Sequence, residues 1–257
     1  RIRAPRGTRR IRIMKRFITL GLLLATLSSC EPQLTADRIV KKSIAYHQLD
    51  KLYTTPIDFQ FRDYLYHINR TADPYIYSRQ ITFIDSITYQ PIVQIDSLFN
   101  SSNLRRYQNN LRLDLPQEAA SKFANSINSV AYFQQLPLPL TDPAAQLELL
   151  PNTRIEGTDH YTLKVTFAAE NGGSDPEDTY RYYFNAKTFA LSYLSYDFHV
   201  NGGGVRFRKA FENPQPPFIF LHYDNYKAPK DTPLDSLPQL FERGVLELVS
   251  RIEGRVL

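Results

Sequence analysis

The chain has 257 residues, with 31 Lys and Arg against 26 Asp and Glu, one Cys, one Met and no Trp. Eight basic residues precede position 20 and no acidic residue occurs before Glu31, so the chain from position 30 onward has 23 basic and 26 acidic residues, a net charge of −3. A mildly acidic body without a Lys/Arg stripe cannot neutralise a run of phosphates, which argues against nucleic acid as a partner.

The start of the chain reads as an export signal. Lys15 and Arg16 precede an uncharged apolar run over residues 17–27, which is too short to cross a bilayer as a helix. Leu27-Ser28-Ser29-Cys30 follows and resembles the bacterial lipobox. The resemblance implies cleavage after Ser29, diacylglycerol on the Cys30 sulfur and acylation of the new amine, so membrane lipid is an expected partner.

This signal divides the chain. We expect residues 1–13 to be upstream reading frame or a mis-called start, residues 14–29 to be the signal peptide, residues 30–35 to be a lipid-anchored tether, and residues 36–257 to form a single lipoprotein domain. Surface-displayed lipoproteins carry a dense acidic run after the modified Cys, whereas here a single Glu31 follows. We therefore expect an outer-membrane lipoprotein that faces the periplasm. With no second Cys, the domain must be stabilised by a hydrophobic core.

Hydrophobic periodicity and turn residues predict the elements in chain order. These are a helix over 36–52, strands over 57–61, 64–68, 75–84, 88–95 and 111–115, a helix over 116–134, strands over 155–167, 180–184, 189–200, 205–211 and 218–226, a short helix near 237–243, and a strand over 245–252. We expect a bulge near Arg62-Asp63, a hairpin loop over 185–188 and a tight hairpin at Gly202-Gly203-Gly204.

The helices do not alternate with the strands, which favours an α+β fold. We expect a curved antiparallel sheet (incomplete β-barrel) of about 9–11 strands, with two or three helices covering one face. The predicted strands 189–200 and 218–226 are apolar on both faces, so both faces need a cover. Helices can supply one cover, and sheet curvature, a lid or a ligand can supply the other.

Several segments together carry a family resemblance. They are residues 126–133 with Leu136-Pro137 and Asp142, residues 172–178 leading into 182–185, residues 193–196, 202–208, 225–227 and 246–250. The set resembles a family of uncharacterised Bacteroidota lipoproteins, with a domain of unknown function, over nearly the whole mature chain. Here Gln48-Leu49 stands where small, glycine-like residues are expected. More loosely, the outline is similar to the LolA and LolB lipoprotein-carrier fold, which implies helices over an apolar cavity.

The usual catalytic and cofactor motifs are missing from the sequence. There is no nucleophile elbow of the G-x-S-x-G type, and lipidation of Cys30 would leave no thiol nucleophile. The glycine run joins two strands, so no helix N-terminus follows it to hold a phosphate. The five His residues lack metal-ligand spacing. We therefore predict a protein without a cofactor or metal, and not an enzyme.

Two groups of charged residues are candidates for a polar or ligand site. Asp175 and Asp178, with Glu177 between them, can bind a calcium ion or simply form a solvated hairpin tip. Arg206 and Arg208 are two residues apart on one strand and therefore share a face. They can hold a lipid phosphate or a partner carboxylate, or they can pair with local acids such as Glu212 or the acidic loop.

Three functions remain open at this point. The first is a lipid-anchored envelope module, without catalytic activity, that binds an apolar ligand or lipid in its concave sheet. The second is an envelope assembly or scaffold protein that binds an unidentified protein through a Tyr-rich surface. The third is a hydrolase that uses Asp175 or Asp178 with His199 or His222, which requires a carboxylate and an imidazole within hydrogen-bond reach.

A last expectation concerns modification. Ser86, Ser97 and Ser236 each follow Asp and precede an aliphatic residue, which resembles the O-glycosylation sequon of exported Bacteroidota proteins. Asp-Ser is also a common turn pair, and Ser236 can merely cap the last helix. Ser86 ranks first among the three, because it falls between two predicted strands.

Overall fold

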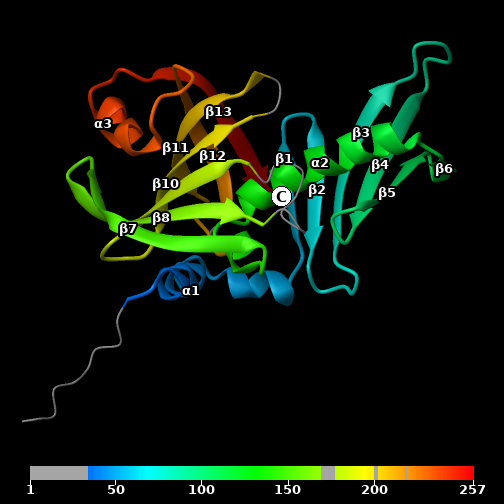
Figure 1. Cartoon of the computed structure of the whole chain (residues 1–257). Coiled ribbons are helices and arrows are strands. Elements are labelled where there is room, and N and C mark those ends of the chain that lie inside the picture. Colours follow the sequence, from blue (N-terminus) through cyan, green and yellow to red (C-terminus); the bar gives the residue numbers. More distant parts are fainter. Residues whose placement is uncertain (1–33, 169–176, 200–201, 218) are drawn as a thin grey trace, which may run out of the picture. The chain divides into compact units, whose positions relative to one another are not determined.

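Figure 1 shows the computed structural model, which describes residues 34–168, 177–199, 202–217 and 219–257. The expected signal peptide, Ser29 and Cys30 lie outside the described residues, as does Asp175. Residues 35–257 form one compact unit. None of the helices in the described ranges is long and apolar enough to span a membrane.

The unit is built on one antiparallel sheet (Figure 1). Within the described residues the sheet has thirteen strands, in the order β6-β5-β4-β3-β2-β1-β13-β12-β11-β10-β9-β8-β7. The strands are β1 Ile57–Phe61, β2 Tyr64–Asn69, β3 Ile76–Ile84, β4 Pro91–Phe99, β5 Asn103–Gln108, β6 Leu111–Leu113, β7 Ala145–Ile155, β8 Thr158–Phe167, β9 Thr179–Asn185, β10 Leu191–Phe198, β11 Gly204–Glu212, β12 Phe220–Ala228 and β13 Glu247–Val256.

The described residues also contain three α-helices and several short 3-10 helices. The α-helices are α1 Ala36–His47, α2 Gln117–Gln134 and α3 Leu237–Glu242; the 3-10 helices are η1 Leu49–Tyr53, η2 Leu138–Thr141 and η4 Leu234–Ser236. The α+β fold with an antiparallel sheet is confirmed. The sheet has more strands than the sequence pattern predicts. The pattern misses β5 because that strand is rich in polar residues, and it misses β7 because that strand contains Pro151, which an edge strand tolerates.

The sheet consists of two runs of sequential hairpins that meet where the first and last strands pair. Phe59 of β1 lies opposite Val256 of β13, so segments from the two ends of the described unit are neighbours. The connection from edge strand β6 to the opposite edge strand β7 contains α2, which packs on one face of the sheet (Figure 1). The longest helix therefore covers strands from both runs.

Local geometry differs from the expectations at two turns. Arg62 and Asp63 form a two-residue turn between β1 and β2, with a φ of 55° at Arg62, so the expected bulge is wrong. The apolar residues switch from odd to even positions here because the chain passes from β1 into β2. The first helix ends at His47, earlier than expected, because Gln48 adopts a left-handed φ of 53° that glycine favours.

Both faces of the second run are covered by the chain itself. On one face, Tyr223 of β12 donates a hydrogen bond to the carbonyl oxygen of Phe133 in α2. On the other face, the Phe207 ring of β11 lies 4.9 Å from the ring of Phe241 in α3. The two-sided apolar pattern of these strands is thus accounted for by helices on opposite faces.

Candidate functional site

A row of aromatic rings crosses β8, β9 and β10 on the face that packs against α2. We call Phe167, Tyr180, Tyr196 and Phe198 the aromatic ladder. Successive ring centres are 5.8, 5.4 and 6.2 Å apart. The row forms because Tyr180 lies directly opposite Tyr196 in the sheet, and residues two apart on a strand share a face. Phe167, Tyr180 and Phe198 are only half-buried.

Helix α2 covers the Phe167 end of the aromatic ladder, where the Tyr132 ring lies 6.3 Å from Phe167 and 6.5 Å from Tyr180. The Tyr132 and Tyr182 hydroxyls are 2.7 Å apart, within hydrogen-bond distance. Burial raises the pKa of Tyr182 and of Tyr223 well above the ordinary tyrosine value, so both hydroxyls stay neutral at physiological pH. This end of the face is filled by the protein's own side chains.

Arg208 of β11 lies beside the aromatic ladder and is 9% exposed. Its Nη2 donates to the Tyr196 hydroxyl at 2.7 Å and its Nε donates to Asn225 Oδ1 at 3.3 Å. The guanidinium carbon lies 4.2 Å from the centre of the Phe133 ring. Arg208 forms no ion pair with a carboxylate of the described residues, so its charge is balanced only by rings and neutral dipoles.

Arg206 lies at the outer end of the same row. Its guanidinium carbon is 4.9 Å from the centre of the Phe198 ring, and Nη1 donates to the Val205 carbonyl oxygen at 3.0 Å. Among the described residues it too has no carboxylate partner. The alternative in which these arginines pair with Glu212 or Asp178 is not what the structure shows, since Glu212 faces His47 and Asp178 faces His199.

The structure brings Asp178 and His199 together. Asp178 Oδ1 lies 3.3 Å from His199 Nδ1 and accepts the His199 backbone N–H at 3.2 Å. The separation meets the distance requirement of the hydrolase hypothesis. Within the described ranges, however, no hydroxyl is hydrogen-bonded to His199 as a nucleophile would be. His222 lies instead 3.6 Å from Asp224.

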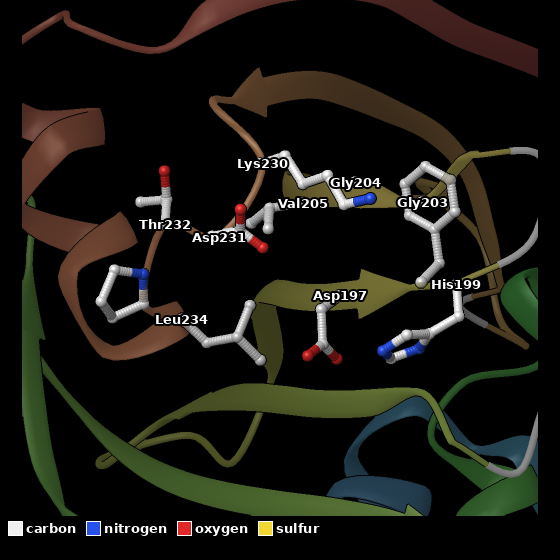
Figure 2. A pocket seen from close by; sticks show the side chains of 11 residues that line it. Asp197, His199, Gly203, Gly204, Val205, Lys230, Asp231, Thr232 and Leu234 are labelled. Atoms are coloured by element: carbon white, nitrogen blue, oxygen red, sulfur yellow. The ribbon is translucent and has the colours of Figure 1, made fainter.

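Asp197 and His199 line a cavity of about 320 Å³ (Figure 2). Its other lining residues come from the end of β10, the start of β11 and the loop that leads from β12 into η4. Lys230 and Asp231 of this loop add one positive and one negative side chain. The cavity thus combines charged side chains of both signs with apolar ones, among them Phe198 of the aromatic ladder.

A second cavity of about 370 Å³ is lined in part by Tyr193, Lys209 and Glu212. Beside it, Glu156 accepts hydrogen bonds from the Tyr193 hydroxyl and, at 2.7 Å, from Lys209 Nζ. These two bonds, that from Lys209 first, hold the pKa of Glu156 below the ordinary value. Sequence reasoning missed Glu156, because it follows β7 in a turn that carries no motif.

The three serines with an Asp-Ser sequon lie in different settings. Ser86 is exposed in the turn between β3 and β4, where Asp85 Oδ1 accepts the backbone N–H groups of Ile87 and Thr88. Ser97 lies within β4, and Ser236 donates its hydroxyl to the Pro233 carbonyl oxygen at 2.7 Å. Of the three, Ser86 has the most accessible setting.

The comparisons with known proteins place the chain in a family. The model of a family of unknown function, DUF6503, matches residues 14–254. The chain belongs to the DUF6503 family. A comparison of this DUF6503 chain with curated proteins finds no match.

Solved structures provide distant likenesses to the DUF6503 chain. The LolA superfamily protein NE2245 from Nitrosomonas europaea is 15% identical with a TM-score of 0.40, covering 77% of this chain and 88% of its own. A DUF1329 family protein from Desulfovibrio piger is 9% identical with a TM-score of 0.34, covering 81% and 99%. The lipoprotein LppX from Mycobacterium tuberculosis is 10% identical with a TM-score of 0.26, covering 66% and 91%. Each likeness concerns the fold alone.

Proposed function

We propose that this DUF6503 chain is a lipid-anchored, non-catalytic binding module of the cell envelope, whose ligand is an amphiphile with an anionic group. The observation that carries the proposal is the position of Arg208, a buried cation beside the aromatic ladder without a carboxylate partner among the described residues. Cys30 would supply the membrane anchor through the short tether of residues 30–35, and the periplasmic face of the outer membrane is the site we favour.

The energetics of Arg208 support an anionic ligand group. Taking a guanidinium out of water costs several kcal/mol unless an opposite charge compensates. A cation over an aromatic ring recovers about 1–2 kcal/mol, and two neutral hydrogen bonds recover a similar amount. Nη1 of Arg208 donates to no described residue, so it can donate to a carboxylate or phosphate oxygen of a ligand.

The aromatic ladder supports an apolar ligand body. Phe167, Tyr180 and Phe198 are half-buried, and Phe198 continues outward from Tyr196 and Arg208 at the end of the ladder away from Tyr132. An acyl chain or ring system laid on these rings would remove apolar surface from water, which stabilises a complex by about 25 cal/mol per Å². Arg206, stacked on Phe198, places a second cation at the outer end. The row therefore suits a ligand that is apolar along its length and charged at one end.

The test is to purify the full-length protein from native membranes in mild detergent and to analyse bound molecules by native mass spectrometry and organic extraction. We expect the wild type to retain an anionic amphiphile in addition to the acyl chains on Cys30. Arg208→Met and Arg206→Met should each retain less of it. Arg112→Met removes an exposed arginine on β6 and should retain the wild-type amount.

Two results would contradict the proposal. One is a wild-type protein that carries only its covalent acyl chains. The other is equal retention by the wild type and both site variants. Arg206→Met guards against misfolding, because Arg206 is half-buried and its loss leaves the packing under α2 intact. Circular dichroism spectra that match the wild type establish that each variant is folded.

A further inference from the structure

The cavity of Figure 2 lies mainly on the sheet face opposite the aromatic ladder, but Phe198 of the ladder also lines it. Asp197 and Val205 form a directly opposed pair of β10 and β11, and both line the cavity. Tyr196 and Arg206 form the next pair, which points to the other face because successive side chains of a strand alternate. Leu234, at the far side of the cavity, packs with the α3 cluster. The cavity thus shares Phe198 with the site proposed above, whereas Arg206 and Arg208 do not line it.

One wall of the cavity offers hydrogen-bond acceptors. Asp197 lines the cavity, and its Oδ1 accepts the Thr179 backbone N–H at 2.7 Å (Figure 2). His199 stands beside it, with Nδ1 3.3 Å from Asp178 Oδ1. An ionised carboxylate only accepts, so Nδ1 donates to Asp178, and in the tautomer with a single proton Nε2 is an acceptor.

The opposite wall offers a cation. Lys230 reaches across from the loop after β12, with its ammonium group above the wall that holds Asp197 and His199 (Figure 2). Nζ donates to the Gly202 carbonyl oxygen at 3.0 Å, which positions the ammonium and leaves its other donors available. Asp231, at a left-handed φ of 70°, adds a second carboxylate to the lining.

The opposite charges of the cavity do not neutralise one another. Among the described residues, Lys230 forms no ion pair, and neither do Asp197 and Asp231. A carboxylate and an ammonium that face one cavity without touching leave a gap that a molecule with both charges can bridge. Between these charges, the side chains of Val205, Pro233 and Leu234 form an apolar part of the lining.

We propose that this cavity binds a small zwitterion of the α-amino acid class with an apolar side chain. The ligand carboxylate would accept from Lys230, the ligand ammonium would donate to Asp197 and to Nε2 of His199, and the side chain would contact Leu234 and Pro233. A volume of about 320 Å³ is at the small end of ligand pockets and suits a single amino acid. A ligand with one charge would leave the opposite wall without a partner.

The experiment is isothermal titration calorimetry of the full-length protein in detergent with L-leucine. Isoamylamine, which is leucine without the carboxylate, and isocaproate, which is leucine without the ammonium, are the matched single-charge probes. We expect leucine to bind and both single-charge probes to bind up to about tenfold more weakly, a difference of up to about 1.4 kcal/mol, since the charged groups of the cavity are partly exposed.

Variants connect the binding to the two walls. Lys230→Met removes the cation and keeps most of the stem, and Asp197→Asn removes the charge while its amide oxygen can still accept the Thr179 N–H. Each should lower the leucine affinity severalfold, up to about tenfold. Lys227→Met removes an exposed lysine of β12 that pairs with Glu247, outside the cavity, and should keep the wild-type affinity.

The proposal is overturned if millimolar leucine gives no binding heat with the wild type, or if isocaproate or isoamylamine binds as well as leucine. Equal affinity of the wild type and both wall variants would also overturn it. Neither result tests the amphiphile site, because that site is tested at Arg206 and Arg208, which do not line the cavity. The two proposals therefore fail independently.

Discussion

Nε2 of His47 in α1 accepts a hydrogen bond from the backbone N–H of Leu191 in β10, 3.1 Å away across 144 residues of sequence. His47 is fully buried. Because Nε2 accepts, the proton of the neutral ring resides on Nδ1, which faces Glu212 Oε1 at 3.9 Å. The His47 imidazole thus hydrogen-bonds the first helix to the start of β10, and its other nitrogen lies near the end of β11.

Replacing His47 with Leu should destabilise the protein by about 1–3 kcal/mol, because the buried N–H of Leu191 would lose its acceptor. Urea unfolding followed by circular dichroism measures the change. His67→Leu is the matched control, since His67 is partly exposed and pairs with an exposed Asp58. An equal loss in both variants would contradict the structural role of the His47 bond.

Glu212 should make the stability pH-dependent. Burial raises the pKa of Glu212 above the ordinary glutamate value, and Tyr46 and His47 of α1 face this carboxyl group. Between the ordinary and the raised pKa the native state binds more protons than the unfolded state, so the free energy of unfolding falls as pH rises through this window. Glu212→Gln should remove that fall, whereas Glu148→Gln, on exposed edge strand β7, should keep it. Urea unfolding across this pH range measures the free energy of unfolding. An unchanged pH dependence of that free energy in Glu212→Gln would contradict the role of Glu212.

Asp96 holds two arginines beneath α2. It is 1% exposed and accepts from Arg79 Nε at 3.1 Å and from Arg106 Nε at 2.6 Å. Asp96→Asn leaves two buried guanidinium groups without a carboxylate and should cost about 3–5 kcal/mol in urea unfolding. Asp114→Asn breaks an exposed pair with Arg112 and should cost nothing measurable. Similar losses in both variants would show that the buried cluster is not what stabilises this part of the sheet.

The resemblance of residues 27–30 to a lipobox predicts the covalent state of the N-terminus. Protein from the native host should have the mass of residues 30–257 plus acyl chains on Cys30. Cys30→Ser should be neither acylated nor cleaved after Ser29. It should therefore retain the mass of the uncleaved signal. Intact-mass spectrometry distinguishes these species. An unacylated wild-type chain would refute the anchor.

Ser86 is the position at which we expect O-glycosylation. It is exposed in the turn between β3 and β4, whereas Ser97 lies within a strand and the Ser236 hydroxyl is engaged with a carbonyl oxygen. Protein from the native host should carry extra mass that disappears in Ser86→Ala and persists in Ser97→Ala. A mature mass explained by polypeptide and acyl chains alone would exclude the modification.

Local sequence patterns predicted the elements whose stability is local. Alternation of apolar residues located β8, β9, β10 and β11, and Asn185 marked the hairpin loop, where its Oδ1 accepts two backbone N–H groups. The pattern failed for β5 and β7, because a polar strand or one with a proline shows its pairing only through its neighbours. The pairing of β1 with β13 likewise left no local mark, since it joins residues almost 200 positions apart.

The same division applies to the candidate sites. Strand periodicity places Arg206 and Arg208 on one face, because side chains on a strand repeat every two residues. Their neighbours follow from the folded arrangement, since Phe133 comes from α2, whose position depends on the packing of two distant runs of strands. The cavity with Lys230 arises in the same way, where the end of β10 meets a loop after β12. The alternation of side chains along a strand determines the sheet face of each residue, and long-range contacts determine which residues it packs against.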